Sequence, residues 1–540
     1  MNCYLGPDRH TLRLITFLAL LLPLQAFSDV YDVSTTVELR EALAAAADAG
    51  GDNIIRLAAG TYSTQDDGGG TFEFNSALNG QLSLEGQAAE EVMFDGALQE
   101  MILLVTRYGA GAFDVAIRNL TFQNSAAEFD AAVQFSGLRG ELEFRDVRFI
   151  GNLSGALSIS GNEDLNVVVD GCSFSSNVSE TWYAAVFAQV SGGFVEIKNS
   201  SFIDNSGFAL IRGNYPGRVM ISNSYFKNNQ FSSCARCSSP AITANSVHNS
   251  SFINNTFYYG LLGVDELFNS RFSNNGYSGE DDVRYTVNNG FSISLGTGVV
   301  NNQFIDSGIV FVSTTNPLAN NLFSNTRLGA TDENGLPNIS NNIFINNEQA
   351  DLVGEFYAIN LNNNYIDIDR VEDIQISGSG NLSGSTHLGF VNAEEGDYRL
   401  TSASGLIDTG TTDSELAYIT DYDYTGTIAR IIGASIDIGP YEYDADIFSS
   451  PSTFFTALLQ IVQTARSEGG SQQNMTARES PPEAEVARQL VRQEGATVQA
   501  RATDTADKPS SIPVIPHYLM LIMTCLVGLF GLRRLRDLSA

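Results

Sequence analysis

The sequence lacks the motifs of several large enzyme classes. It contains no HExxH, GxSxG, P-loop or EF-hand pattern, which excludes the zinc, serine-hydrolase, nucleotide and calcium sites that these motifs build. Only four histidines and one tryptophan occur in 540 residues, and residues 29–443 contain two lysines, Lys198 and Lys227. No repeated segment has apolar residues spaced three and four apart over ten or more positions, which excludes a helical array.

Basic residues are scarce relative to acidic ones. The formal net charge is −33, and residues 29–443 alone carry 51 acidic and 18 basic side chains. Such a surface repels polyanions, so we expect no nucleic-acid partner, and binding of a polyuronate would need bridging cations. The same acidic surface would also favour solubility at high salt concentration. We expect no cofactor, and acidic runs such as Asp66-Asp67 fit solvated loop tips better than calcium ligands.

Cysteine is also rare. Cys3 and Cys525 lie near the two ends, Cys172 stands alone, and Cys234 and Cys237 form a C-x-x-C motif in a Ser-rich segment. No second pair is present to complete a zinc site. We therefore predict that Cys234 and Cys237 form a disulfide that ties a loop, in preference to a metal or redox site.

A short phrase recurs along the chain: Asn or Asp, two variable residues and an aromatic residue. Its aromatic residues are Phe122, Phe149, Phe202, Phe226, Phe252, Phe272, Phe304, Phe323, Phe344 and Tyr365, with a variant copy at Phe174. The mean step is about 24 residues, which is within the range of solenoid repeats. The chain is therefore predicted to be an array of similar coils.

Each repeat has the pattern of a short strand between corners. Apolar residues stand seven and five positions before the aromatic residue, as Val195 and Ile197 do before Phe202, and this alternation predicts a strand with one buried face. Asn recurs three positions before the aromatic residue. It also recurs two or three positions after it, at Asn124, Asn152, Asn177, Asn205, Asn229, Asn255, Asn275 and Asn347. Because Asn tolerates the left-handed backbone conformation, we interpret these positions as corners of a parallel β-helix.

Equivalent side chains of successive coils should stack about 4.8 Å apart. The aromatic residues would then form a continuous core that runs as far as Tyr365. The position two residues earlier should also face inward, and it holds Leu120, Val147, Cys172, Ser200, Ser224, Ser250 and Ser270. Cys172 is therefore predicted to be an inert buried thiol.

The N-terminal region has two predicted elements before the β-helix coils. Residues 1–28 contain Arg9 and Arg13, an apolar run and the small-residue site Ala26-Phe27-Ser28, which predicts a secretory signal peptide and export. Thr35-Thr36-Val37-Glu38 is a capping box that opens a helix over residues 39–49, and Gly50-Gly51 ends it. We interpret this helix as a lid on the first coil of a β-helix that spans residues 29–395.

Residues 396–443 form a distinct block. Its characteristic segments are Gly396-Asp397-Tyr398-Arg399-Leu400, Leu406-Ile407-Asp408-Thr409-Gly410 and Asp437-Ile438-Gly439-Pro440-Tyr441-Glu442. The block resembles the choice-of-anchor Q domain of bacterial surface proteins, which follows right-handed β-helices, and residues 38–62 resemble the usual start of such proteins. The resemblance implies an all-β, right-handed parallel β-helix of the pectin lyase-like type, with this block at the end of the solenoid. The residues themselves suggest that Asp408, Arg430 and Asp437 form a salt-bridged structural cluster in the last coils.

The C-terminal region consists of three segments of different composition. Residues 444–466 contain an amphipathic stretch that we expect to form a capping helix, and residues 467–511 are polar, which predicts a flexible linker. Residues 512–536 combine an apolar run with Arg533, Arg534 and Arg536, which predicts a membrane segment with its positive charges kept inside. This tail resembles bacterial tripartite sorting signals that begin Ile-Pro-Thr-Leu, from which Val514 and Ile515 depart. A plain membrane anchor is the alternative.

The candidate site is a column of outward-facing residues four positions before the aromatic residue. The column holds Arg118, Arg145, Asp170, Lys198, Ser222 and His248. In an enzyme, the cations would neutralise a uronate carboxylate while Lys198 or His248 accepts a proton. In a charge ladder, Asp170 would instead pair with Arg145 and Lys198 across neighbouring coils.

Fold alone does not decide between these readings, because right-handed β-helices include polysaccharide lyases, hydrolases and epimerases as well as binding proteins. We interpret the chain as a monomeric, cell-surface-anchored, non-catalytic scaffold that binds an extracellular polysaccharide or another cell-surface component. The alternative is an enzyme that cleaves or epimerises an extracellular polysaccharide.

Overall fold

In the computed structural model the chain divides into two units, Met1–Ser449 and Ser450–Ala540, and the described residues all lie in the first. The described residues are 28–445, except for 127–130, 180–182, 191, 214–217, 232–240, 258–261, 278–289, 294–297, 313–316, 331–337, 348–350, 354–357, 368–374, 414–420 and 426–427. The predicted signal peptide, the Cys234–Cys237 disulfide and the predictions for residues 446–540 therefore lie outside the described residues. Within the described ranges, no helix is long and apolar enough to cross a membrane.

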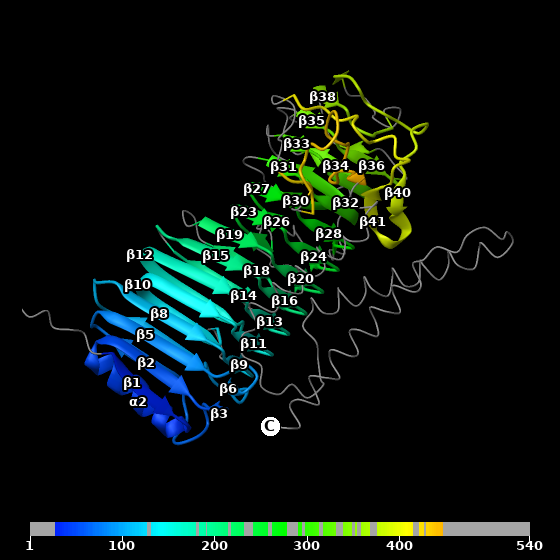
Figure 1. The fold of residues 1–540 in the computed structure, drawn as a ribbon. Helices are drawn as coiled ribbons and strands as arrows, with labels where there is room; N and C mark the ends of the chain where they lie inside the picture. The colour runs from blue at the N-terminus through cyan, green and yellow to red at the C-terminus, as the bar shows by residue number, and fades with distance from the viewer. Residues whose placement is uncertain are drawn as a thin grey trace, which may run out of the picture. The chain divides into compact units, whose positions relative to one another are not determined.

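The chain coils into a long stack of parallel strands (Figure 1), and a 21-stranded sheet follows two paths through this stack. The first path pairs β1 (Asp29–Val33), β2 (Gly51–Leu57), β5 (Gly80–Gly86), β8 (Phe113–Arg118), β10 (Val133–Arg145), β12 (Leu157–Asp170), β15 (Phe194–Lys198), β19 (Arg218–Ser222), β23 (Ser246–His248), β27 (Glu266–Phe268), β31 (Gly298–Val300), β33 (Leu318–Ala319), β35 (Asn338–Ser340), β38 (Ala358–Asn362) and β39 (Gln375–Ser377). The second path pairs β4 (Phe72–Ser76), β7 (Leu103–Arg107), the long strands β10 and β12, β14 (Tyr183–Gln189), β18 (Ala209–Gly213), β22 (Ile242–Thr243) and β26 (Leu262–Gly263).

A 14-stranded sheet forms a further face of the stack. It contains β3 (Gly60–Ser63), β6 (Val92–Asp95), β9 (Thr121–Gln123), β11 (Arg148–Ile150), β13 (Ser173–Ser175), β16 (Ser201–Ile203), β20 (Tyr225–Lys227), β24 (Ser251–Ile253), β28 (Arg271–Ser273), β30 (Gly290–Ile293), β32 (Gln303–Val312), β34 (Leu322–Ala330), β36 (Ile343–Ile345) and β37 (Leu352–Val353). A four-stranded sheet of very short strands contains β17 (Ser206–Gly207), β21 (Gln230–Phe231), β25 (Thr256–Phe257) and β29 (Gly276–Tyr277). These pairings are all parallel, which confirms the predicted parallel β-helix; its right hand stays a prediction.

The predicted aromatic column is present and longer than expected. Strand register aligns Tyr62, Phe94, Phe122, Phe149, Phe174, Phe202, Phe226, Phe252, Phe272, Phe304, Phe323 and Phe344. Every one of these side chains is buried, and neighbouring ring centroids lie between 4.5 Å, for Phe226 and Phe252, and 5.5 Å, for Tyr62 and Phe94. The first two members, Tyr62 and Phe94, precede the repeats found in the sequence. The column therefore spans the stack from its first coils.

The column does not continue to Tyr365, which corrects the sequence prediction. Tyr365 pairs with Ile343, so the next residue, Ile366, occupies the inward position after Phe344. Ile366 is fully buried in the main core, and the corner before it is Asn363, with a φ of 52°. Tyr365 consequently faces outward and packs against a second apolar cluster.

The Asn residues divide into two structural roles, only one of which was predicted. Asn223 and Asn228, three before and two after Phe226, have φ values of 49° and 55°, so they are left-handed corners. Asn229, three positions after the same Phe, is instead buried and donates its side-chain N–H to Asn255 Oδ1 at 2.8 Å. Equivalent side-chain bonds link Asn152, Asn177, Asn205, Asn229, Asn255 and Asn275 into one ladder. The prediction that these six residues form corners was wrong. Asn suits both a left-handed corner and a stack of hydrogen-bonded buried amides, and these residues form the stack.

A second internal ladder contains Cys172, as predicted. Cys172 N–H donates to Ser200 Oγ at 3.2 Å, and Ser200 N–H donates to Ser224 Oγ at 3.3 Å. Further along the stack, Ser gives way to Asn, and Ser270 N–H donates to Asn302 Oδ1 at 2.9 Å. Cys172 is a free, buried thiol, and burial raises its pKa to about 12. The thiolate is therefore disfavoured, which agrees with an inert residue.

Helix α2 (Thr36–Ala49) lies at the N-terminal end of the stack (Figure 1). The predicted capping box is present, since Glu38 N–H donates to Thr35 Oγ1 at 3.2 Å and Thr35 N–H donates to Glu38 Oε2 at 3.1 Å. Leu39 and Leu43 are fully buried in the main core. The C-terminal part of the helix is fixed by Ser76, whose hydroxyl donates to the carbonyl of Ala47 at 2.9 Å.

The described residues between 386 and 443 pack on the outside of the last coils. This segment contains β40 (Phe390–Asn392), the 3-10 helix η2 (Ala393–Glu395) and β41 (Asp397–Leu400), and β40 pairs with β41 in antiparallel fashion. Its side chains form the second apolar cluster with outward-facing residues of β32, β34 and β36, which are Ile305, Leu322, Ile343 and Ile345. The Tyr398 hydroxyl donates to Ser324 Oγ at 3.1 Å, and Thr411 N–H donates to Asn341 Oδ1 at 2.7 Å. We call residues 386–443 the lateral block.

A buried polar cluster stabilises the lateral block. Arg430, whose side chain is 1% exposed, forms an ion pair of 3.2 Å with Glu442, a partner that sequence reasoning missed. Asp437 accepts hydrogen bonds from the Asp408 and Tyr443 backbone amides at 2.7 and 2.6 Å. Asp408, Arg430 and Asp437 thus lie in one structural region as expected, although the ion pair of Arg430 is with Glu442.

Candidate functional site

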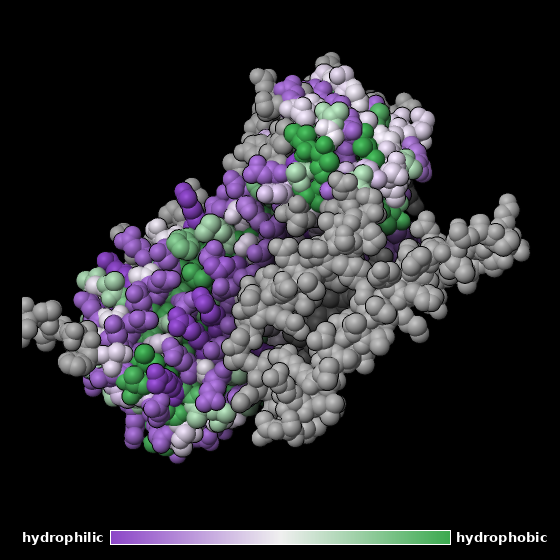
Figure 2. All heavy atoms as spheres, in the orientation of Figure 1, coloured by the Kyte–Doolittle hydropathy of each residue, from purple (hydrophilic) through white to green (hydrophobic). Residues whose placement is uncertain are grey.

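The predicted charged column exists as a stack on the first path of the 21-stranded sheet. The register aligns Glu85, Arg118, Arg145, Asp170, Lys198, Ser222, His248 and Phe268, one residue from each successive strand from β5 to β27. A second outward column lies two residues earlier on each strand and includes Glu143, Glu196 and Glu266. We call these two columns the charged face. Figure 2 shows mainly hydrophilic residues, with hydrophobic ones interspersed, over the part of the stack near its N-terminal end that is visible in this view.

Glu143 is the centre of the largest ion-pair group on the charged face. Arg118 Nε donates to Glu143 Oε2 at 3.0 Å, and Arg118 Nη1 lies 3.6 Å from Glu85. Arg145 Nη2 donates to the other oxygen of Glu143 at 2.8 Å. Burial alone would raise the pKa of Glu143, but the hydrogen bonds and charges of Arg118 and Arg145 hold that pKa below its ordinary value.

Lys198 and Asp170 do not pair with each other. Lys198 Nζ donates to Glu196 Oε2 at 2.8 Å on its own strand, and Asp170 Oδ1 accepts a hydrogen bond from Asn199 Nδ2 at 2.8 Å. The predicted ladder, in which Asp170 pairs with Arg145 and Lys198, is therefore not the arrangement in this structure. Residues two apart on a strand point to the same face, so a Glu in the second column competes with the next coil for each cation.

The Glu residues of the second column were missed by sequence reasoning. Glu143, Glu196 and Glu266 each stand six positions before a core Phe. This recurrence was visible in the sequence, at a position that strand alternation also turns outward. It would have identified the partners of Arg145 and Lys198.

His248 lies where the column ends in an aromatic environment. Its ring meets Phe268 edge-on, with a centroid distance of 5.1 Å. Its Nε2 is buried and has no hydrogen-bond partner within the part of the chain that the structure describes. Burial lowers the pKa of His248, so the neutral imidazole is favoured. A polymer lying on the face would not reach the buried Nε2.

The chemistry of the face is that of paired charges with spare donors. The hydrogen bond and charge of Glu196 raise the pKa of Lys198, whereas a catalytic base requires a lowered lysine pKa. Arg145 is 54% exposed, and one of its five N–H donors is used by Glu143, so donors remain for a ligand. The face can therefore donate and accept hydrogen bonds on several coils, which are spaced about 4.8 Å apart.

Comparison with known proteins gives only distant likenesses. No family model and no curated protein matches this chain. Among solved structures, the pectate lyase Pel9A is 14% identical, with 78% of this chain and 98% of that chain covered and a TM-score of 0.31. The polysaccharide lyase Pedsa3628 of family PL6 from Pseudopedobacter saltans is 12% identical, with 65% and 92% covered and a TM-score of 0.32.

A third likeness is to the A-module of the mannuronan C-5 epimerase AlgE4 from Azotobacter vinelandii. It is 13% identical, with 67% of this chain and 96% of that chain covered and a TM-score of 0.26. All three TM-scores are low. The assignment of a parallel β-helix therefore rests on the strand pairing of this chain.

Proposed function

We propose that the chain binds an extracellular polysaccharide or another cell-surface component through the charged face, without chemically changing it. The observation that carries this proposal is the pairing of Arg118, Arg145 and Lys198 with carboxylates of the same face. A lyase or epimerase acting on a uronate would need cations free to neutralise the substrate carboxylate and an accessible base. Paired cations with spare N–H donors suit the hydroxyl groups of a glycan instead.

The geometry of the face also favours an extended ligand. Its columns present one residue per coil, so a polymer lying along the stack would meet polar groups of several successive coils from β5 to β23. Each exposed ion pair contributes little by itself, about 0–1 kcal/mol. Affinity would therefore come from several coils acting together.

The test measures binding and turnover in the same samples. The purified full-length chain is exposed to a panel of neutral and acidic polysaccharides, and each mixture is assayed for new reducing ends, unsaturated ends and changed uronate stereochemistry. We expect binding without new product. The triple variant Arg118→Ala, Arg145→Ala, Lys198→Ala should lose binding and keep its melting temperature within a few degrees.

A matched control carries Arg148→Ala and Lys227→Ala, two cations on the outside of the 14-stranded sheet. This control should bind as the wild type does. Retained binding in the triple variant would remove the charged face as the site. Appearance of product that the triple variant abolishes would establish the enzyme alternative.

We propose further that the protein is exported and held at the cell surface by residues 512–536, as a monomeric, right-handed β-helix in which residues 396–443 are of the choice-of-anchor Q type. The support for this setting is the sequence alone. Deletion of residues 512–540 should release folded protein from the membrane fraction with its melting temperature unchanged. A full-length chain that is found free of the membrane, with Ala540 still present by mass spectrometry, would contradict both anchoring and sorting.

A further inference from the structure

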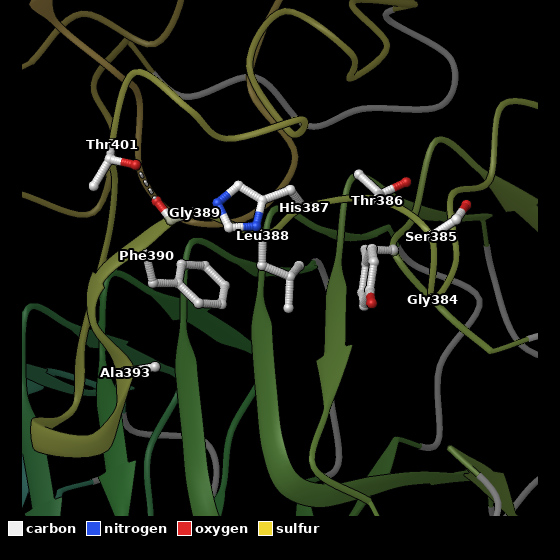
Figure 3. A pocket seen from close by; sticks show the side chains of 10 residues that line it. Gly384, Ser385, Thr386, His387, Leu388, Gly389, Phe390, Ala393 and Thr401 are labelled. Atoms are coloured by element: carbon white, nitrogen blue, oxygen red, sulfur yellow. Dashed lines mark hydrogen bonds between the residues drawn. The ribbon is translucent and has the colours of Figure 1, made fainter.

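A pocket of about 620 Å³ lies where the lateral block meets the last coils (Figure 3). Its wall is formed by the segment from Gly384 to Phe390, together with Tyr365, Ala393 and Thr401. The volume is in the range of small-molecule sites, about 300–1,000 Å³, and the pocket is a shallow hollow that is widely open to solvent. The pocket lies on the side of the 14-stranded sheet, so it is separate from the charged face on the 21-stranded sheet.

The apolar part of the pocket is held in place from behind. Tyr365, Leu388 and Phe390 are half-buried and pack against the second apolar cluster, while they also line the pocket. Phe390 meets the ring of Tyr398 edge-on at a centroid distance of 5.4 Å. Figure 3 shows Leu388 and Phe390 extending in the same direction from their segment. Tyr365 reaches this position because the last coil turns Ile366 inward in its place.

The polar part of the pocket consists of uncharged hydroxyl groups and one imidazole. Ser385 and His387 are exposed, and Thr386 is half-buried beside them. The Thr401 hydroxyl donates to the carbonyl of Gly389 at 2.8 Å, which leaves its oxygen as an acceptor. Burial and the nearby acidic residues Asp367 and Asp351 raise the pKa of Tyr365, so its phenol stays protonated.

The pocket is neutral on an acidic protein. The chain has 29 basic and 62 acidic residues, yet among the residues that the structure describes no Lys, Arg, Asp or Glu lines this pocket. An anionic ligand would find no Lys or Arg among the described lining residues, and a purely apolar ligand would leave the hydroxyl groups without partners.

We propose that this pocket binds one neutral sugar residue of a glycan. The apolar C–H face of the sugar would lie against Tyr365 and Phe390, since flat aromatic surfaces supply contact area at little entropic cost. The sugar hydroxyls would exchange hydrogen bonds with Ser385, Thr386, His387 and Thr401. This second site goes beyond the proposed function, because it requires neither the charged face nor a polymer long enough to span several coils.

The experiment uses the full-length chain and tetrasaccharides of neutral glucan, mannan and galactan, with tetrasaccharides of galacturonate as the charged comparison. Binding is measured by isothermal calorimetry and by saturation-transfer NMR. We expect at least one neutral tetrasaccharide to bind, and galacturonate to bind ~10-fold more weakly or not at all. Ser385→Trp, which fills the pocket from an exposed position, should weaken binding ~10-fold or more, and His387→Ala should also weaken it.

The matched control is Ser383→Trp, an exposed serine two residues earlier that does not line the pocket. It should bind as the wild type does. The proposal is overturned if no neutral tetrasaccharide binds, if binding survives Ser385→Trp, or if galacturonate binds equally well. The triple variant of the charged face should retain this binding, so failure of the two proposals can be told apart.

Discussion

The middle and last coils of the solenoid have the same interior but different exteriors. In both regions a stacked Phe column fills the core, with centroid distances of 4.7 Å for Phe202 and Phe226 and 4.8 Å for Phe323 and Phe344. The residue directly before each Phe faces outward from the 14-stranded sheet. It is Ser201 in the middle coils and Leu322 near the end. Ser201 is partly exposed, whereas Leu322 is buried under the lateral block. The repeat therefore specifies the inside of each coil, and the outward residue specifies what covers it.

Phe226→Asp should have the largest effect, because it attacks the interior that both regions share. Phe226 is fully buried between Phe202 and Phe252, and a carboxylate there would have no partner. We expect destabilisation of about 5 kcal/mol or more and loss of the cooperative melt by circular dichroism. Lys227→Asp, the outward neighbour on β20, is the control and should melt nearly as the wild type does. An unchanged melt for Phe226→Asp would show that the inward register is wrong.

Leu322→Asp separates the two regions directly. It should detach the lateral block at a cost of about 3 kcal/mol and leave the coils before β28 folded. The same change at Ser201, which lies in the same outward column, should cost less than about 0.5 kcal/mol. Hydrogen exchange of the β41 amides is the measurement, and equal exchange in both variants would refute the proposed difference between the regions.

Asn229→Ala tests the internal ladder of the middle coils. The substitution removes the donors to Phe202 O and Asn255 Oδ1 and also the acceptor of Asn205. We expect a loss of about 2–3 kcal/mol, since buried polar groups are left unpaired. Asn228→Ala, at the adjacent left-handed corner, should cost only about 1–2 kcal/mol. A urea-unfolding series that ranks Asn228 above Asn229 would mean that corners matter more than ladders.

The smallest predicted effect concerns pH and the charged face. The folded pKa of Glu143 lies below its ordinary value, so its ion pairs stabilise the protein above that ordinary value, and this stability is lost as pH falls through the folded pKa. Between about pH 5 and about pH 3 the wild type should therefore lose up to about 1 kcal/mol more than Glu143→Gln, since these pairs are partly exposed. Melting temperatures of both proteins at the two pH values provide the check, and parallel losses would remove Glu143 as a contributor.

Sequence reasoning predicted the inside of the coil better than its outside. Alternating apolar residues and a recurrent Phe have one stable register, since a shift of one residue would turn the whole apolar set away from the core. Near the end, the phrase fits only Asn362-x-x-Tyr365, yet the structure places the fully buried Ile366 in the inward position, three residues after the corner Asn363. The register of the last coil could not be read from the phrase alone.

The charged face shows a second limit of the sequence. The column containing Arg145 and Lys198 followed from the repeat, and the register confirms that these residues stack. Their partners Glu143 and Glu196 were missed although they recur six positions before the Phe, because the repeat shows that they face outward and not that they take the cations from Asp170. The pocket beside Tyr365 could not be predicted from the sequence, because it forms only through the shifted register at Tyr365 and the packing of the lateral block.

The Asn ladder makes neighbouring coils interchangeable. Each amide donates to the next coil and accepts from the previous one, so a cut between Asn205 and Asn229 exposes the same donor and acceptor as a cut between Asn229 and Asn255. Duplication of a coil in the gene would therefore insert a unit whose two surfaces already match its neighbours. The length of such a protein can therefore change by whole coils during evolution, while the packing of the core stays the same from coil to coil.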